Sequence, residues 1–127
     1  MNNKKLLLII AAIKKIKSVK AIYLFGSQAR GEAGPLSDID ICVIAPAASE
    51  KDRNKILGCA YYDVDVVLFA DLPLTIKVRI FREGKPLHVA DLHYIDELAW
   101  RTMKEYFDYK LILKEFIETY LPGAHYV

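Results

Sequence analysis

The sequence predicts an α/β (α+β) fold in which a small mixed β-sheet is flanked by helices. Short runs rich in β-branched and aromatic residues, such as residues 21–25 and 61–69, alternate with longer segments of helical periodicity. Residues 46–62 separate two expected strands and are long enough for a crossover, which permits parallel pairing. The 127 residues, of which 54% are hydrophobic, suit a single domain with one core over about residues 1–90 and a C-terminal helical segment over about residues 91–121.

The first element expected is an amphipathic helix. Residues 2–13 have a basic beginning and an apolar run, as a signal peptide does, but Lys14 and Lys15 interrupt the run and no cleavage site follows. The apolar residues recur at helical spacing: Leu6, Ile9, Ile10, Ile13 and Ile16. We therefore expect a helix packed on a core, in a cytoplasmic protein without a membrane partner.

The second element is a strand over residues 21–25, which ends in a tight turn. Gly26 and Ser27 follow the strand, where a turn would free backbone N–H groups and one hydroxyl at a strand-to-helix junction. Such groups bind anions.

Paired carboxylates begin the next strand. Asp38 and Asp40 are two residues apart, so in an extended segment both project from the same side of the sheet, opposite Ile39 and Ile41. Two carboxylates about 5 Å apart repel by roughly 3 kcal/mol at an effective dielectric near 20. A divalent cation would remove that repulsion, and oxygen-only ligands favour Mg²⁺ or Mn²⁺.

A third carboxylate is expected from the strand over residues 61–69. If this strand runs parallel to the Asp38–Asp40 strand, their beginnings lie side by side and the carboxylates converge. Asp63 and Asp65 both lie on the appropriate face by alternation. Asp63 lies closer to the preceding loop, where it could be a solvated residue at the strand entry.

Later segments predict a helix over residues 49–60, a helix over residues 74–83 and a short strand over residues 86–90. Asp91 suits the N-cap of residues 92–121, which form one helix or a broken pair ended by Pro122 and Gly123.

The segment 92–121 carries more apolar residues than one packing face needs. One side has Ile95, Leu98, Thr102, Tyr109, Leu113, Phe116 and Tyr120, while Trp100, Phe107, Leu111 and Ile112 lie elsewhere. Either it is a core helix with ordinary exposed aromatics, or it presents a surface for a homo- or hetero-oligomer.

Composition limits the chemistry further. The net charge of +2 comes without a basic stripe, which argues against nucleic acid as the primary substrate. The two cysteines, Cys42 and Cys59, suit reduced structural thiols, and no Cys/His cluster supports zinc.

The string GSQARGEAGPLSDIDICV, with Gly-Ser, ten residues and then Asp-x-Asp, resembles the DNA polymerase β-like nucleotidyltransferase superfamily, and most closely its minimal nucleotidyltransferases, the MNT proteins. The resemblance is densest over residues 22–44. It implies the polymerase β-like nucleotidyltransferase core, a bound ATP, and Mg²⁺, with two ions expected and Mn²⁺ able to substitute.

The resemblance also implies roles for particular residues. Asp38 and Asp40 would bind the metal that bridges the triphosphate, and Asp65, preferred over Asp63 because its context matches the family, would join a second metal site or accept the proton of the attacking hydroxyl. Gly26 and Ser27 would hold the β- and γ-phosphates. Arg30 could contact a phosphate or pair with Glu32 or Asp38.

Superfamily enzymes generally carry further segments that hold the acceptor, and this chain has no room for one. The resemblance therefore implies an adenylyltransferase antitoxin that transfers AMP from ATP to a hydroxyl, expected to be tyrosine, of a partner HEPN toxin. Two alternatives remain: an antitoxin that neutralises by binding with an unused site, and a stand-alone transferase for a small molecule of the aminoglycoside type.

Overall fold

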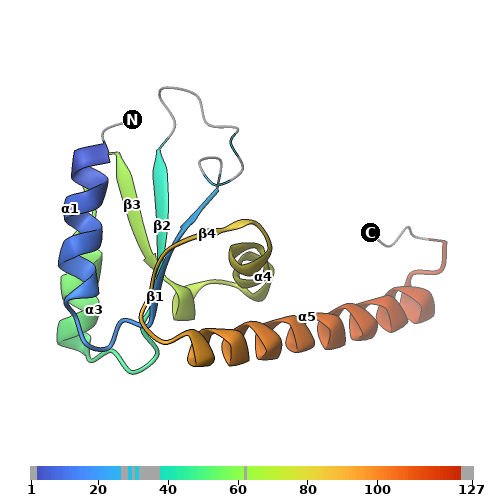
Figure 1. Cartoon of the computed structure of the whole chain (residues 1–127). Helices are drawn as coiled ribbons and strands as arrows, with labels where there is room; N and C mark the ends of the chain where they lie inside the picture. Colours follow the sequence, from blue (N-terminus) through green and yellow to red (C-terminus); the bar gives the residue numbers. More distant parts are fainter. Residues whose placement is uncertain (1–2, 27–28, 30, 32–37, 62, 124–127) are drawn as a thin grey trace.

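The computed structural model describes residues 3–26, 29, 31, 38–61 and 63–123 (Figure 1). The elements in chain order are α1 (Asn3–Lys14), β1 (Ala21–Phe25), β2 (Ile39–Ile44), α3 (Glu50–Leu57), β3 (Val64–Leu68), the 3-10 helix η1 (Phe69–Asp71), α4 (Leu74–Glu83), β4 (Lys85–Val89) and α5 (Leu92–Tyr120). The strands form one sheet in the order β3-β2-β1-β4. β2 and β3 are parallel and the other neighbours are antiparallel, so the predicted mixed sheet is confirmed.

Helices cover both faces of the sheet and bury two apolar clusters. α1 and α3 lie together on one side of the sheet, and α4 lies on the other (Figure 1). The first cluster takes its sheet residues mainly from odd positions of β2 and even positions of β3, with Leu6, Ile9 and Ile13 of α1 packed on them. Cys42 and Ile44, at even positions, belong to the second cluster with Ile80 of α4 and Ile95 of α5. Asp40 is also at an even position and therefore faces the α4 side.

Helix boundaries follow local capping chemistry. Ser49 caps α3 by accepting a hydrogen bond from the backbone N–H of Asp52, and Asp91 caps α5 by accepting one from Tyr94. The predicted helix over residues 74–83 has the bounds of α4. The helix predicted over residues 49–60 is shorter, Glu50–Leu57, and the strand predicted over residues 86–90 lies one residue earlier.

α5 is one continuous helix of 29 residues, about 44 Å long. Its first half packs on the domain through Ile95 and Thr102, which are each 4% exposed. Its second half is exposed: Phe107 is 63% accessible and Tyr120 68%. Figure 1 shows this half extending past the sheet. The core-helix interpretation therefore holds only for the first half of α5.

Within the described residues, no helix combines the length and the apolarity that spanning a membrane requires.

Candidate functional site

Two carboxylates lie side by side where β2 and β3 begin. Asp40 of β2 is in register with Asp65 of β3 in the parallel pair, and adjacent strands are about 4.8 Å apart. Asp38 precedes β2 by one residue and is exposed. The sequence thus predicted the residues that meet here, although Asp38 lies just outside the strand expected to hold it.

The pair is electrostatically strained. The pKa of Asp40 is raised above its ordinary value of 3.8, first by burial and then by the negative charges of Asp65 and Asp38. Neither Asp40 nor Asp65 has a hydrogen-bond or ion-pair partner among the described residues. Negative charge at this position is therefore uncompensated by the described part of the chain.

The backbone turn at Gly26 packs closely against the carboxylate of Asp40. Its strand neighbour Phe25 pairs with Asp40 across β1 and β2. Gly26 has φ +75°, and a Cβ added there would lie 2.6 Å from Oδ2 of Asp40. Only glycine meets both conditions, the left-handed backbone and the close approach. Ser27 and Arg30, the other predicted nucleotide-binding residues, lie outside the described residues.

Asp63, which directly precedes β3, has different surroundings from Asp65. Its carbonyl oxygen accepts a hydrogen bond of 2.9 Å from the backbone N–H of Ile39. Its carboxylate Oδ1 is buried and has no hydrogen-bond partner. The interpretation of Asp63 as a solvated residue is therefore wrong for this oxygen, while Asp65 is exposed and directly beside Asp40.

The donor set suits a metal ion that arrives with phosphate. Among the described residues, no three His, Cys, Asp or Glu side chains are grouped as a complete metal site. Mg²⁺ is commonly bound through one or two carboxylates with substrate phosphates and water as the other ligands. Asp40 and Asp65 fit that mode, and they do not form a closed protein cage.

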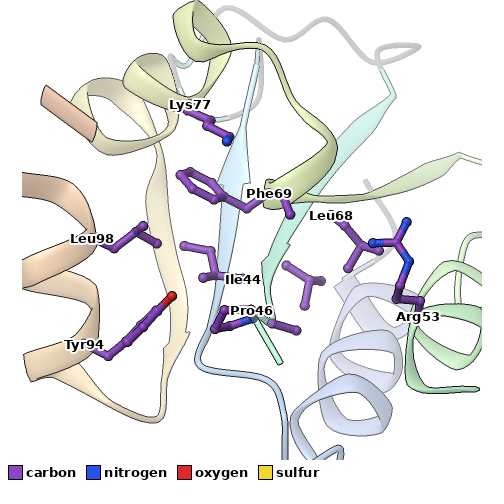
Figure 2. A pocket seen from close by; sticks show the side chains of 11 residues that line it. Ile44, Pro46, Arg53, Leu68, Phe69, Lys77, Tyr94 and Leu98 are labelled. Carbon is purple, nitrogen blue, oxygen red and sulfur yellow. The ribbon is translucent and has the colours of Figure 1, made fainter. Parts of the chain in front are cut away.

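A separate cavity of about 210 Å³ lies at the other end of the sheet (Figure 2). Ile44, Phe69, Tyr94 and Leu98 line it, with the Lys77 amine 5.3 Å from the centre of the Phe69 ring. Ile44 is four residues beyond Asp40, about 13 Å along the strand. This cavity is therefore distinct from the carboxylate site.

Sequence reasoning missed the arginines of α4. Arg79 lines a hollow of about 110 Å³ together with Phe25, Gly26, Ile76 and Glu83. The only indication in the sequence was the spacing of Arg79 and Arg82, which puts them one turn apart on a predicted helix. Their nearness to Gly26 depends on how α4 packs on the sheet.

Comparison with known proteins identifies the family of the chain. The nucleotidyltransferase domain family matches residues 6–118. A Methanocaldococcus jannaschii protein named "Putative protein adenylyltransferase" is 34% identical over 98 residues, which cover 71% of this chain and 76% of that protein.

Two solved structures extend the comparison. A chain from the crystal structure of a toxin–antitoxin with AMP-PNP superposes with a TM-score of 0.68 and 26% identity, covering 94% of this chain and 98% of that one. A chain from the complex of a tri-AMPylated Shewanella oneidensis HEPN toxin with its MNT antitoxin gives a TM-score of 0.67 and 25% identity over the same shares.

The chain therefore belongs to the nucleotidyltransferase domain family, and its four-stranded mixed sheet with flanking helices matches the fold of these neighbours. The more specific prediction is also confirmed. The chain is of the minimal, MNT type, and its enzyme class is adenylyltransferase.

Proposed function

We propose that the chain is a Mg²⁺-dependent protein adenylyltransferase that acts as the antitoxin of a HEPN toxin. The observation that carries the proposal is the register of Asp40 with Asp65, with the Gly26 backbone packed against Asp40. The neighbours support the partner and the nucleotide, since one holds AMP-PNP and another pairs an MNT antitoxin with a tri-AMPylated HEPN toxin.

The proposed reaction transfers AMP from ATP to a hydroxyl, with tyrosine as the expected acceptor. The acceptor oxygen bonds to the α-phosphorus, the bond from that phosphorus to the bridging oxygen breaks, and pyrophosphate leaves. Bound Mg²⁺ would neutralise the phosphate charge and stabilise the attacking and leaving oxygens.

Residues of this chain take three tasks in that reaction. Asp38 and Asp40 would hold the metal that arrives with the nucleotide; Asp38 is exposed and Asp40 is partly buried. Asp65 is exposed beside Asp40, where it can join a second metal site or accept the hydroxyl proton. The Gly26 turn presents backbone N–H groups to the phosphates, and Ser27 and Arg30 are proposed to extend that contact.

The test is incubation with labelled ATP, Mg²⁺ and the proposed HEPN partner, followed by intact-mass analysis. We expect one or more AMP units on the HEPN protein, none with Asp38→Asn/Asp40→Asn, and undiminished transfer with Glu50→Gln, an exposed control on α3. Undiminished transfer by a folded Asp40→Asn chain would refute the mechanism. Asp63→Asn beside Asp65→Asn decides which is the third carboxylate.

The exposed half of α5 favours a second candidate, an antitoxin that neutralises by binding alone. Phe107, Phe116 and Tyr120 are each more than half exposed there, as expected of a surface that a partner covers. Under this candidate, Asp38→Asn/Asp40→Asn/Asp65→Asn still protects cells from the toxin. Loss of protection with normal complex formation would exclude it.

A further inference from the structure

A groove between α4 and α5 adjoins the carboxylate site. A hollow of about 510 Å³ is lined by Thr75, Val78, Arg79, Arg82, Glu83 and Tyr106, and we call it the arginine groove. Its volume lies in the range of about 300–1,000 Å³ found for sites that hold small molecules. Arg79 and Glu83 also line the smaller hollow that contains Gly26, so the two hollows share a wall.

The charges of the arginine groove select for one kind of ligand. Arg79 and Arg82 have no ion-pair partner among the described residues. Both guanidinium groups lie in one wall of the groove, beside Glu83. A phosphodiester carries a negative charge, and guanidinium groups suit the binding of its oxygens.

Tyr106 adds a second element of nucleotide recognition. It lies in the first part of α5, is partly buried, and lines the groove opposite the arginines of α4. A cationic groove with an aromatic side chain is the usual way to hold a nucleotide without reading its base, because every base can stack on the ring.

We propose that the arginine groove binds the AMP already attached to a modified acceptor and presents it for a second transfer. The inference rests on the proposed function, and one structural neighbour contains a toxin that carries three AMP units. A ribose hydroxyl of the attached AMP would bond to the α-phosphorus of a second ATP as pyrophosphate leaves, and its proton would go to the base that serves the first transfer.

The position of the groove fits this use. α4 separates the Gly26 turn from α5, and the exposed half of α5 begins directly after Tyr106 (Figure 1). An acceptor seated on that half of α5 would reach the carboxylates by passing Arg82 and then Arg79. The attached AMP then lies in the groove while its ribose reaches the Gly26 turn.

The test compares Arg79→Ala/Arg82→Ala with the wild-type chain in a time course of intact mass on the HEPN partner. We expect the first AMP to be added within about twofold of the wild-type rate, and species with two or more AMP units to fall at least about tenfold, because a charge-assisted contact is lost. Lys51→Ala, an exposed cation on α3, is the matched control. Tyr106→Phe should retain multiple addition and Tyr106→Ala should lose it.

A binding measurement tests the groove without turnover. Tyrosine linked to AMP through its hydroxyl should bind the wild-type chain and Lys51→Ala equally, and Arg79→Ala/Arg82→Ala about tenfold more weakly. Equal binding to all three would overturn the proposal.

The transfer assay separates the two hypotheses. Addition of one AMP only, an unchanged product distribution in the arginine variant, or equal loss of the first and later transfers would each overturn the groove while leaving the proposed function intact. Absence of any transfer would instead count against the proposed function.

Discussion

Replacing Asp40 by asparagine should make the metal-free protein more stable. Asp40 and Asp65 are neighbours in register, about 5 Å apart by strand spacing. Their repulsion is about 1 kcal/mol at the dielectric of water and about 3 kcal/mol at an effective dielectric of 20. The lower value applies to fully solvated carboxylates and the upper value to buried ones. Because Asp65 is exposed and Asp40 is partly buried, the relief should lie between these two values.

The assay is thermal unfolding in EDTA. A 127-residue chain has an unfolding entropy of about 0.27 kcal/mol per degree, so relief of 1–3 kcal/mol raises the Tm of Asp40→Asn by about 4–11 °C. Asp108→Asn, an exposed helical control, should change Tm little. Saturating Mg²⁺ with AMP-PNP should stabilise the wild-type chain by about 4.1 kcal/mol at about 1,000 times Kd, which exceeds the relief and reverses the order of the two proteins.

The pH dependence has a defined sign. Because the pKa of Asp40 is raised in the folded state, its ionisation opposes folding. The penalty is complete above the raised pKa and disappears as the pH falls below the ordinary value of 3.8. The advantage of Asp40→Asn should therefore shrink between pH 7 and pH 4. A variant less stable than wild type in EDTA at pH 7 would refute the reasoning and make Asp40 a structural residue.

Three further predictions concern single positions. Gly26→Ala should lower both Tm and the transfer rate more than Gly31→Ala does. Both glycines have positive φ, but a Cβ at Gly26 would lie 2.6 Å from Oδ2 of Asp40, whereas a Cβ at Gly31 meets nothing within 4 Å. Equal effects of the two substitutions would disprove the Asp40 contact. Iodoacetamide at pH 8 should modify Cys59 before Cys42, because burial raises the pKa of Cys42 to about 12; mass analysis that finds Cys42 modified first would contradict its burial. Ile95→Ala should reduce the free energy of unfolding by about 2–5 kcal/mol in urea titration, as a buried isoleucine does; a loss under 1 kcal/mol would mean that α5 is not anchored there.

The sequence was informative wherever a short-range rule decides the structure. Alternation placed Asp40 and Asp65 on one face, and a crossover length permitted the parallel pairing that brings them into register. Capping chemistry located the start of α5 at Asp91. Alternation and capping depend on residues within a few positions of one another, which is why a pattern could predict them, whereas the crossover length only permitted the pairing.

The missed features depend on packing between distant elements. The α4 arginines approach Gly26 only because α4 returns across the sheet after η1, and periodicity carries no information about that direction. The buried oxygen of Asp63 was missed for the same reason, since an acidic residue before a strand is usually solvated. Periodicity also predicted one apolar side along the whole of α5. It could not show that only the first half of this side packs on the domain.

The second half of α5 has the features of a helix that a partner protein covers. Residues 107–120 are a 14-residue stretch in which Phe107, Ile112 and Tyr120 are each more than 60% exposed. An isolated helix of about 12–15 residues is marginal in water, and most helices in proteins are stabilised by packing of an apolar face. Tyr109 and Phe116 continue the face by which Ile95 packs on the domain. A helical partner laid along this face would extend the packing that begins at Ile95, which joins the stability of α5 to the binding of the acceptor and places that acceptor beside the α4 arginines.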